Sequence, residues 1–199
     1  MTPNKKFSRS TYYIILIIVV PIIFFGIFGA VAKHPYMKKE IALYSGPGDI
    51  KDISFRFLFF PVKGYNITFP YFDLSRQKSE TYKLTGLPAK EQAGIYLVVE
   101  EKENYWDKDE NKARLKAKVE FIIKDSKGKI VLHVNDYLKD MIWMTPPETG
   151  LAGRALYNMD TSFFNPKKNE TYKLSMKFSP DENLDSLQGY VFIECGGSI

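Results

Sequence analysis

The most regular feature of the sequence is the alternation of apolar and polar residues after position 52. Apolar side chains occupy every second position in five segments: 53–59, 65–69, 81–85, 115–134 and 171–178. A period of two is the spacing of a β-strand with one buried face. Residues 95–99 (IYLVV) are apolar at every position, which is typical of a central strand buried on both faces. A last strand is predicted at 190–195.

The segment 115–134 predicts the clearest hairpin. Five apolar side chains share one face of its first strand: Leu115, Ala117, Val119, Phe121 and Ile123. Residues 125–128 (DSKG) have turn composition, and Ile130, Leu132 and Val134 are expected to return on the same core face. A slip of one residue would turn this apolar set toward water, so the register is well specified.

Two segments interrupt the alternation and are expected to be connections. Residues 100–112 (EEKENYWDKDENK) are highly charged, and residues 135–160 lack a strand period. Asn135 or Asp136 can cap a short helix that runs to Met144 and ends at the two prolines beyond it. About eight short strands, one short helix and no strand–helix–strand spacing predict an all-β fold, an antiparallel β-sandwich of immunoglobulin-like or jelly-roll type.

One hexapeptide occurs twice. Residues 80–85 (ETYKLT) return as residues 170–175 (ETYKLS), 90 positions later. This separation is too wide for a solenoid repeat. We interpret the two copies as similar strands of one sandwich under the same packing constraint.

An apolar stretch of a different kind precedes the alternating part. Residues 11–32 (TYYIILIIVVPIIFFGIFGAVA) contain no charged side chain. A helix rises by about 1.5 Å per residue, so a stretch of this length matches the roughly 30 Å hydrocarbon core of a bilayer. It has no polar face, as a soluble helix would. Lys5, Lys6 and Arg9 supply the basic flank of an N-in, C-out signal anchor, so we expect a transmembrane helix here.

This span sets the expected organisation: a basic N-tail at 1–10, the anchor at 11–32, a linker at 33–52 and one exported β domain at 53–199. The protein would cross the cell (inner) membrane once, with its C-terminal domain on the outer or periplasmic side. The alternative is a signal peptide cleaved after Ala32, which would make the domain secreted. Signal peptides have about 7–15 apolar residues, fewer than here, which favours the retained anchor.

Charge argues against nucleic acid as a partner. The chain has 28 basic and 23 acidic side chains, but residues 1–32 hold three of the basic ones and none of the acidic ones. The exported part therefore carries 25 against 23, a net charge of +2, whereas nucleic acid requires a basic patch or stripe. No motif for a cofactor occurs, and we expect none.

The candidates for a metal or a catalytic dyad are weak. Asp107, Asp109 and Asn111 have the spacing that opens a calcium loop, but lysines stand where that loop needs Gly and Glu. We expect a solvated loop there and no metal site. Cys195, the single cysteine, and His133 are predicted to point to different layers, so Cys195 is expected to be a buried structural thiol.

The remaining aromatic residues define the predicted binding site. It consists of Tyr105 and Trp106 in the first connection and Tyr137, Trp143, Arg154 and Tyr157 in the second. Long connections are often functional, and Trp, Tyr and Arg are enriched among binding hot spots. If both connections emerge at one end of the sandwich, Trp106 and Trp143 flank one surface. The competing interpretation is that Tyr137, Ile142 and Trp143 plug the open end of the sandwich.

These observations predict a binding protein rather than an enzyme. The β domain would bind another protein or a cell-envelope component, in an assembly, inhibitor or immunity-type role. One alternative is an envelope hydrolase with its site in loops 100–112 and 135–160, which would need converging carboxylates. Those candidates are Glu103, Asp107, Asp140 and Glu148. Another alternative is a glycan-binding module, which would need Trp106 and Trp143 exposed side by side.

Overall fold

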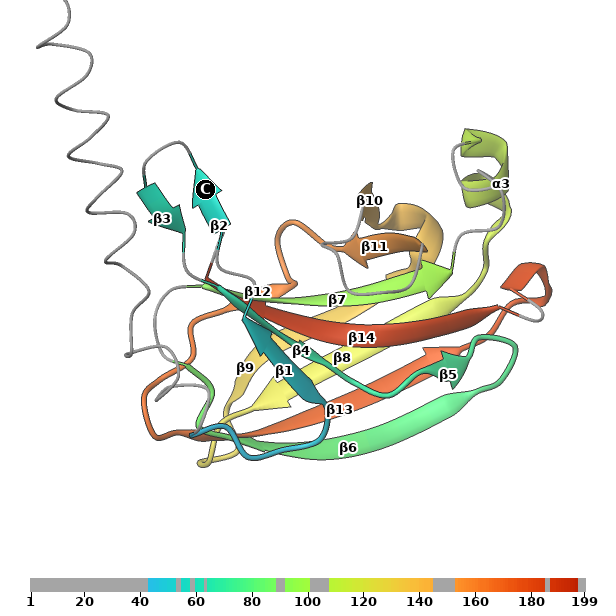
Figure 1. Cartoon of the computed structure of the whole chain (residues 1–199). Coiled ribbons are helices and arrows are strands. Elements are labelled where there is room, and N and C mark those ends of the chain that lie inside the picture. The colour runs from blue at the N-terminus through green and yellow to red at the C-terminus, as the bar shows by residue number, and fades with distance from the viewer. Residues whose placement is uncertain are drawn as a thin grey trace, which may run out of the picture.

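The computed structural model describes residues 43–52, 55–57, 60–62, 64–88, 92–100, 108–144, 153–184 and 187–196. Across these ranges the protein is mostly β, with two antiparallel sheets and one α-helix. Figure 1 shows the larger sheet above the smaller one in a sandwich-like arrangement. The all-β prediction is confirmed at this level. The transmembrane helix predicted at 11–32 lies outside these ranges, and within them no helix is long and apolar enough to cross a bilayer.

The larger sheet has eight strands. Its main path runs β1-β4-β14-β7-β11-β10, and the short strands β5 and β12 pair with β14 and β7. The bounds are β1 (Asp49–Asp52), β4 (Tyr65–Thr68), β5 (Phe72–Asp73), β7 (Ala93–Glu100), β10 (Ile142–Met144), β11 (Gly153–Tyr157), β12 (Phe163–Phe164) and β14 (Gln188–Cys195). The predicted central strand is confirmed, since β7 lies between β14 and β11 and is buried from Ala93 to Val99.

The smaller sheet has four strands in the order β6-β13-β8-β9. Their bounds are β6 (Lys78–Thr85), β13 (Thr171–Ser179), β8 (Lys118–Lys124) and β9 (Ile130–Tyr137). A separate hairpin joins β2 (Phe55–Phe57) to β3 (Phe60–Val62). Of the strand predicted at 53–59, residues 55–57 form β2, and residues 53, 54, 58 and 59 lie outside the described ranges. The pairing of β2 with β3 was not predicted, because alternation marks extended backbone but carries no signal for a reversal. The helical elements are α3 (Asp109–Arg114) and two 3-10 turns, η2 (Leu138–Asp140) and η3 (Glu182–Leu184).

The folded unit begins ahead of the predicted boundary of the β domain. β1 pairs with β4 along its whole length, and Ser45 and Thr85 exchange backbone hydrogen bonds of 2.8 and 2.9 Å. Gly86 permits this close approach, because its φ is +71° and a Cβ there would lie 2.0 Å from the Leu43 oxygen. Part of the segment assigned to the linker at 33–52 thus belongs to the larger sheet.

The core lies between the two sheets and takes the side chains that the alternation directs inward. From the smaller sheet these include Val119, Phe121, Ile123, Leu132, Val134, Tyr172, Leu174, Met176 and Phe178. Cys195 of β14 is in the same core at 2% exposure, and burial raises the pKa of its thiol well above the usual value. This confirms a buried thiol. His133 lies on the outward side of β9, where its Nε2 is 3.2 Å from Glu120 Oε1. Cys195 and His133 therefore do not contact each other.

One residue of the predicted hairpin faces the other way. β8 and β9 pair as expected, but the register shifts between Ile123 and Lys124. Ile123 lies opposite Leu132, whereas Lys124 lies opposite Ile130, which leaves Val131 as the extra residue of a β-bulge. Ile130, predicted in the core, is consequently 48% exposed, and the half-buried Val131 packs against the core.

The prediction for the long connection is also wrong. The helix expected to run to Met144 does not form, because β9 continues to Tyr137, η2 supplies one turn and β10 begins at Ile142. β10 pairs with β11, and three to five residues are too few to show a period of two. The α-helix forms instead at α3, in the charged segment. Its acidic residues lie in the first turn and its basic ones in the last, as the helix dipole favours.

The repeated hexapeptide pairs with itself. β6 carries the first copy and β13 the second, and their antiparallel register sets Lys83 opposite Lys173. The flanking outward pairs bring hydroxyl oxygens to 3.4 Å: Thr81 with Ser175, and Thr85 with Thr171. The two copies are thus strands of one sandwich, as interpreted, and they are also direct neighbours.

Candidate functional site

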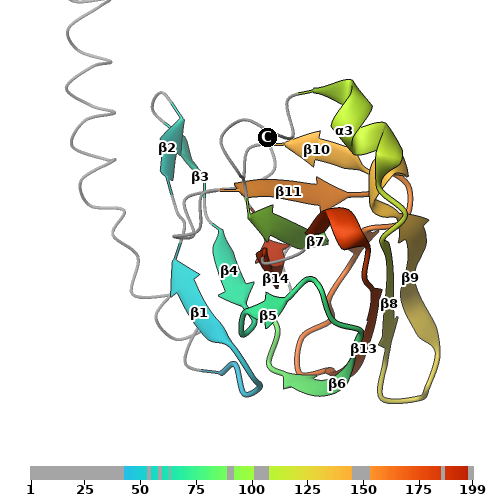
Figure 2. The same cartoon turned by 90° about the vertical axis from the view of Figure 1, so that its right-hand side faces the viewer.

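Trp143 closes one end of the sandwich. It is half-buried on β10, packs against the main core, and donates from its indole N–H to the Leu138 carbonyl at 2.9 Å. The Lys112 ammonium lies 5.8 Å from the centroid of its ring, so α3 and β10 meet at this end, as Figure 2 shows. These contacts favour the plug interpretation for Trp143, and they leave little of its ring for a glycan.

The other predicted binding residues lie on different surfaces. Tyr137, on the smaller sheet, is 45% exposed and has the ammonium groups of Lys118 and Lys139 at 5.4 and 5.7 Å from its ring centroid. Tyr157 belongs to β11 of the larger sheet. Arg154, opposite Val99 in the register, lies three positions earlier on that strand, so it points to the other face from Tyr157. Trp143, Tyr137, Arg154 and Tyr157 therefore do not form one surface.

Several other candidates lie outside the described ranges. These are Tyr105 and Trp106 of the predicted binding site, and Glu103, Asp107 and Glu148 of the hydrolase alternative. The fourth carboxylate, Asp140, is exposed on η2. Among the residues that are described, no three His, Cys, Asp or Glu side chains gather in a way that could hold a metal ion. The part that each of these residues plays in binding or catalysis stays a prediction.

Tyr157 leads instead to a cluster of rings on the outward side of the larger sheet. We name this cluster the aromatic face; it consists of Tyr96, Tyr157, Phe163, Tyr190 and Phe192. Tyr96 stacks on Phe192 with centroids 4.6 Å apart and an interplanar angle of 5°, and it contacts Tyr157 at 5.4 Å. Such contacts add to the stabilisation that area burial provides. The cluster is separate from the core between the sheets.

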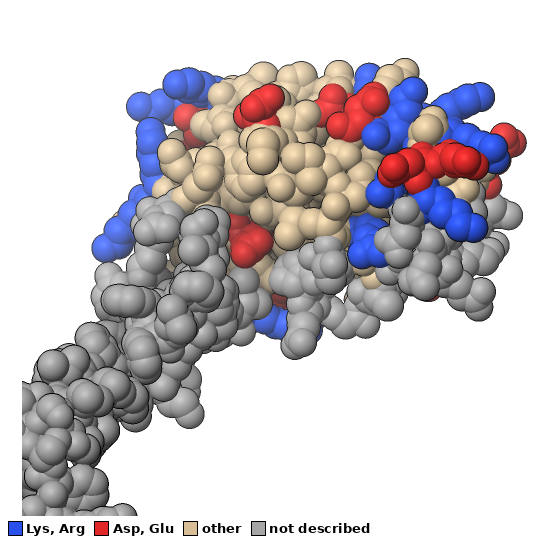
Figure 3. All heavy atoms as spheres, turned by 90° about the horizontal axis from the view of Figure 1, so that it is seen from above, with Lys and Arg blue, Asp and Glu red and all other residues tan. Residues whose placement is uncertain are grey.

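The outward side of a sandwich is ordinarily polar, whereas here the aromatic face makes much of it apolar. Tyr190 and Phe192 are fully shielded from solvent, while Tyr71 and Met159 remain 47% and 68% exposed. The Tyr71 ring meets Tyr190 edge-on at 5.0 Å. Figure 3 views the molecule from this side, where uncharged residues fill the middle and Lys and Arg gather toward the margins. This side therefore offers exposed apolar groups next to a buried aromatic layer.

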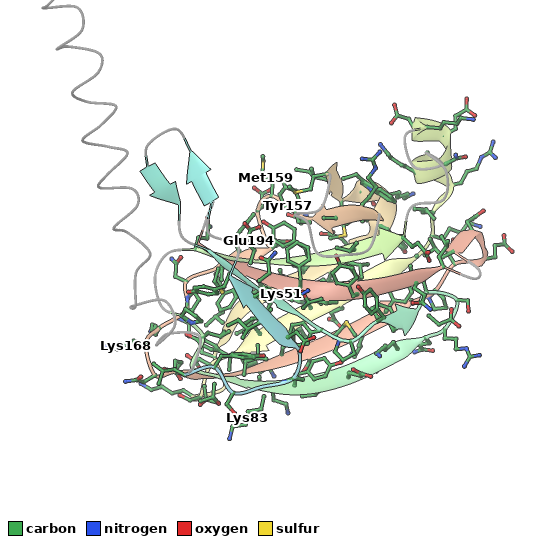
Figure 4. The ribbon with its side chains drawn as sticks, in the orientation of Figure 1. Lys51, Lys83, Tyr157, Met159, Lys168 and Glu194 are labelled. Atoms are coloured by element: carbon green, nitrogen blue, oxygen red, sulfur yellow. The ribbon has the colours of Figure 1, made fainter. Side chains whose placement is uncertain are left out.

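A row of polar residues crosses the same side of the sheet. The register aligns Lys51 of β1 with Asn66 of β4, Asn66 with Glu194 of β14, and Glu194 with Gly94 of β7. We name Lys51, Asn66 and Glu194 the polar row, which ends at Gly94; Figure 4 labels Lys51 and Glu194. Asn66 is 0% exposed, and neither its amide nitrogen nor its amide oxygen has a hydrogen-bond partner among the described residues; the same holds for the Thr68 hydroxyl. Each such buried group costs about 1–3 kcal/mol.

The electrostatics of the polar row follow from its burial. Desolvation raises the pKa of the half-buried Glu194 carboxyl group above its usual value of 4.5. The phenol of Tyr96 has its pKa raised by burial, and further by the charge of Glu194 and by Tyr157. Gly94 leaves room for the Tyr96 ring, because a Cβ at position 94 would lie 2.7 Å from Tyr96 Cε2. The charged form of Glu194 in the polar row is thus poorly solvated.

A hollow of about 440 Å³ opens at the β1 end of this side. It is lined by Gly48, Asp49, Lys51, Thr68, Phe69, Pro70 and Tyr71. Lys51 and Thr68 belong to the same outward side as Asn66. Lys51 lies directly opposite Asn66, and Thr68 lies two positions after it on β4. The hollow therefore brings polar groups of Lys51 and Thr68 close to Tyr71, whose ring contacts the aromatic face.

Sequence reasoning placed Asn66 and Thr68 on the outward side and Tyr65, Ile67 and Phe69 inward, and this is confirmed. It did not foresee that the outward side would be shielded. A signal existed in 95–99 and 190–193, where both alternate sets of positions are apolar. That signal identifies a strand buried on both sides, but it does not tell which neighbouring residues share the second buried side.

The chain matches no family model, and comparison with curated proteins and with solved structures yields no match.

Proposed function

We propose that the protein is a single-pass membrane-anchored binding protein. Its β domain lies on the outer or periplasmic side and binds another protein of the cell envelope through the aromatic face and the polar row. The uncharged span at 11–32 supports the anchor. The observation that carries the binding function is Asn66, a fully buried carboxamide neither of whose polar atoms is hydrogen-bonded within the described part of the chain.

An unpartnered buried amide in a native protein calls for an explanation, such as a water or a ligand. Leucine has nearly the same shape as asparagine and would avoid the cost of the two unmade hydrogen bonds. A carboxamide donates and accepts at once, and it therefore matches a peptide group, which also has one N–H and one C=O. With the Thr68 hydroxyl beside it, the polar row suits the main chain of a bound polypeptide.

The exposed margin of this side has the chemistry of a protein interface. Tyr71 and Met159 are exposed and Tyr157 is half-buried. Tyr71 and Tyr157 contact the buried rings of the aromatic face, and Figure 4 places Met159 beside Tyr157. Tyrosine and methionine are enriched at the cores of interfaces, whereas lysine and glutamate are depleted there. We assign these three side chains to the contact. Because Asn66 is fully buried, we assign it to the recognition of the partner's backbone only after the partner displaces the residues that cover it.

The finer architecture belongs to the same proposal. The sandwich is of immunoglobulin-like or jelly-roll type, the span at 11–32 is retained, and the domain is exported. Isolated membranes washed with alkaline carbonate should keep the protein in the pellet, because a spanning helix resists extraction. Recovery of a soluble form that begins at Lys33 would instead establish cleavage after Ala32.

Site-specific photocrosslinking in intact cells tests the binding surface. A photoreactive residue replaces Tyr157 or Met159 in the full chain, and a matched control carries it at the exposed Lys177 of the smaller sheet. We expect one adduct of the same mass from both test positions, none from the control, and loss of the adduct when Asn66→Leu is added. Adducts of equal yield from all three positions, or no loss with Asn66→Leu, would contradict the proposal.

A further inference from the structure

We propose that the outward side of the smaller sheet binds a linear polyanion of successive phosphate groups that carries no bases. The proposal is independent of the protein partner inferred above, because it concerns the other sheet. It rests on three lysines that the strand register sets in a line. Lys83 of β6 lies opposite Lys173 of β13, and Lys173 lies opposite Lys124 of β8. We name them the lysine row; Figure 4 labels Lys83 at the foot of the molecule.

Like charges placed directly opposite on neighbouring strands destabilise a sheet. Neighbouring strands lie about 4.8 Å apart, so the row brings three ammonium-bearing side chains within about 10 Å. The side-chain ammonium group of none of the three takes part in a hydrogen bond or ion pair with the described part of the chain. The same sheet does pair its lysine where a carboxylate is at hand, since Lys177 Nζ lies 3.2 Å from Glu120 Oε2.

The carboxylates beside the lysine row are already engaged. Asp125 Oδ1 accepts hydrogen bonds from the backbone N–H groups of Lys127 and Lys129, at 3.0 and 2.9 Å. Glu170 Oε1 accepts from the Ser126 N–H at 3.0 Å, and hydrogen bonding to Ser126 holds the pKa of Glu170 below its usual value. Both carboxylates fix the turns at this end of the sheet. Four further exposed lysines lie on these turns: Lys127, Lys129, Lys167 and Lys168.

The lysine row lies in a groove of about 500 Å³. Besides the three lysines, its lining includes the hydroxyls of Thr81, Ser126 and Thr171. Ammonium and hydroxyl groups are the donors that hold phosphate oxygens. A row that extends across three strands fits successive phosphates better than one isolated ion. The net charge of only +2 on residues 33–199 makes this local excess a feature of one face rather than of the whole domain.

The groove is not built for nucleic acid bases. Single-stranded nucleic acids are held by exposed aromatic rings on which bases stack. Tyr172 lines the groove but is 2% exposed, and its hydroxyl accepts a hydrogen bond from the Lys167 N–H at 2.7 Å. Tyr82, the other ring of the lining, is half-buried and packs against the core. We therefore assign the groove to a backbone without bases.

Binding of polyphosphate to the full chain in nanodiscs of zwitterionic lipid tests this assignment. We expect an affinity that falls steeply with salt. The triple variant Lys83→Gln, Lys173→Gln, Lys124→Gln should lose affinity by at least about tenfold, because its binding releases fewer counterions from the polyanion. The matched control changes net charge equally at exposed lysines elsewhere, with Lys108→Gln, Lys116→Gln and Lys139→Gln. Its affinity should stay within about twofold, as should that of Lys83→Arg with Lys173→Arg, which keeps the charges.

Three outcomes would overturn the proposal. The first is equal loss of affinity in the triple variant and its control, which would mean that only net charge matters. The second is tighter binding of a single-stranded DNA of matched charge than of polyphosphate. The third is loss of polyphosphate binding when the nanodisc contains anionic lipid, which would mean that this side rests on the bilayer instead. Circular dichroism of each variant confirms that it is folded.

Discussion

On the outward side of the larger sheet, strands β7 and β14 place Tyr96, Tyr190 and Phe192 under cover, beside the buried Asn66. On the outward side of the smaller sheet, strands β6 and β13 place threonine, serine and lysine in solvent, with Lys83 against Lys173. The inward sides of the two sheets are alike, since both are apolar and meet in one core. The two sheets therefore differ in the chemistry of their outward sides, which is aromatic and buried on the larger sheet and polar and solvated on the smaller one.

The cost of each outward side is of a different physical kind. On the larger sheet it is the desolvation of polar groups that have no partner among the described residues, which is a short-range and salt-independent penalty. On the smaller sheet it is repulsion between solvated charges, which is weaker and falls with ionic strength. A ligand that relieved the first would need hydrogen-bonding groups, whereas one that relieved the second would need only negative charge. Substitutions can separate the two.

The largest expected effect concerns the apolar layer itself. Phe192→Ala should lower the free energy of unfolding by about 3–5 kcal/mol, because the ring is fully buried and leaves a cavity. Ile122→Ala, at a half-buried outward position of β8, should lower it by less than about 1 kcal/mol. Denaturant titration of both variants measures the difference. Equal losses would mean that the two outward sides are covered alike.

A smaller effect of opposite sign is expected at the polar row. Asn66→Leu should raise the free energy of unfolding by about 1–2 kcal/mol, because two unmade hydrogen bonds disappear while the shape is kept. Asn135→Leu, at an exposed outward position of β9, should change it by about 0.5 kcal/mol at most. If Asn66→Leu destabilised the protein, the carboxamide would be satisfied within the chain and no ligand would be needed to explain it.

The two sides should also respond oppositely to pH. The pKa of Glu194 is raised by burial, so its contribution makes the protein less stable as pH rises above about 4.5 through the raised value. The pKa of Glu120 is lowered by its hydrogen bond to His133, and then by Lys177, so its contribution is lost as pH falls below about 4.5. Glu194→Gln should raise the thermal midpoint at pH 8 more than at pH 4.

The Glu120 variant completes the test. Glu120→Gln should lower the thermal midpoint near neutral pH, and the difference from the parent should fade as the solution is acidified. Thermal midpoints of the parent and of both variants, measured between about pH 3 and 8, give the comparison, because this range spans both titrations. A parallel response of the two variants would mean that both carboxylates have the same surroundings.

The smallest effect is expected at the lysine row. Lys83→Glu turns a like-charge pair with Lys173 into an attractive one, which should raise the free energy of unfolding by about 0.5 kcal/mol at low salt. The gain should shrink in 1 M salt, where charges on solvated side chains are screened. A gain that persists in high salt would show that something other than repulsion sets the cost at this position.

Much of the fold could be predicted from the sequence, because alternation reports directly on burial. It identified the inward residues of β8 and β13 and the central position of β7. It failed at Ile130, where one extra residue in β9 reversed the side, and at β10 and β11, which have too few residues to show a period. Short edge strands are held by backbone pairing with a neighbour, and the sequence of one strand does not record that pairing.

The candidate site was less accessible to sequence reasoning. Tyr157 was chosen because it is an aromatic residue in a long connection, and it does reach the aromatic face, whereas Trp143 packs against the core between the sheets. Asn66 could not be singled out, because a polar residue between two apolar ones is what every solvated strand shows. The lysine row depends on which strands are neighbours, and the lysines of β6, β13 and β8 are far apart in the sequence.

The pairing of the two hexapeptide copies has a consequence for how separate chains meet. β6 is an edge strand, and its sequence pairs antiparallel with a near-identical copy of itself in β13. Among the described residues only Ser45 pairs with the outer edge of β6, at Thr85, and the rest of that edge is a template for β6 of a second molecule, which is how edge strands start aggregation. In such a pair Lys83 would face Lys83, and the Lys78–Glu80 ion pair at the same edge adds charge that disfavours it. Lys83→Val should remove this protection, and sedimentation velocity would then show association that the parent lacks.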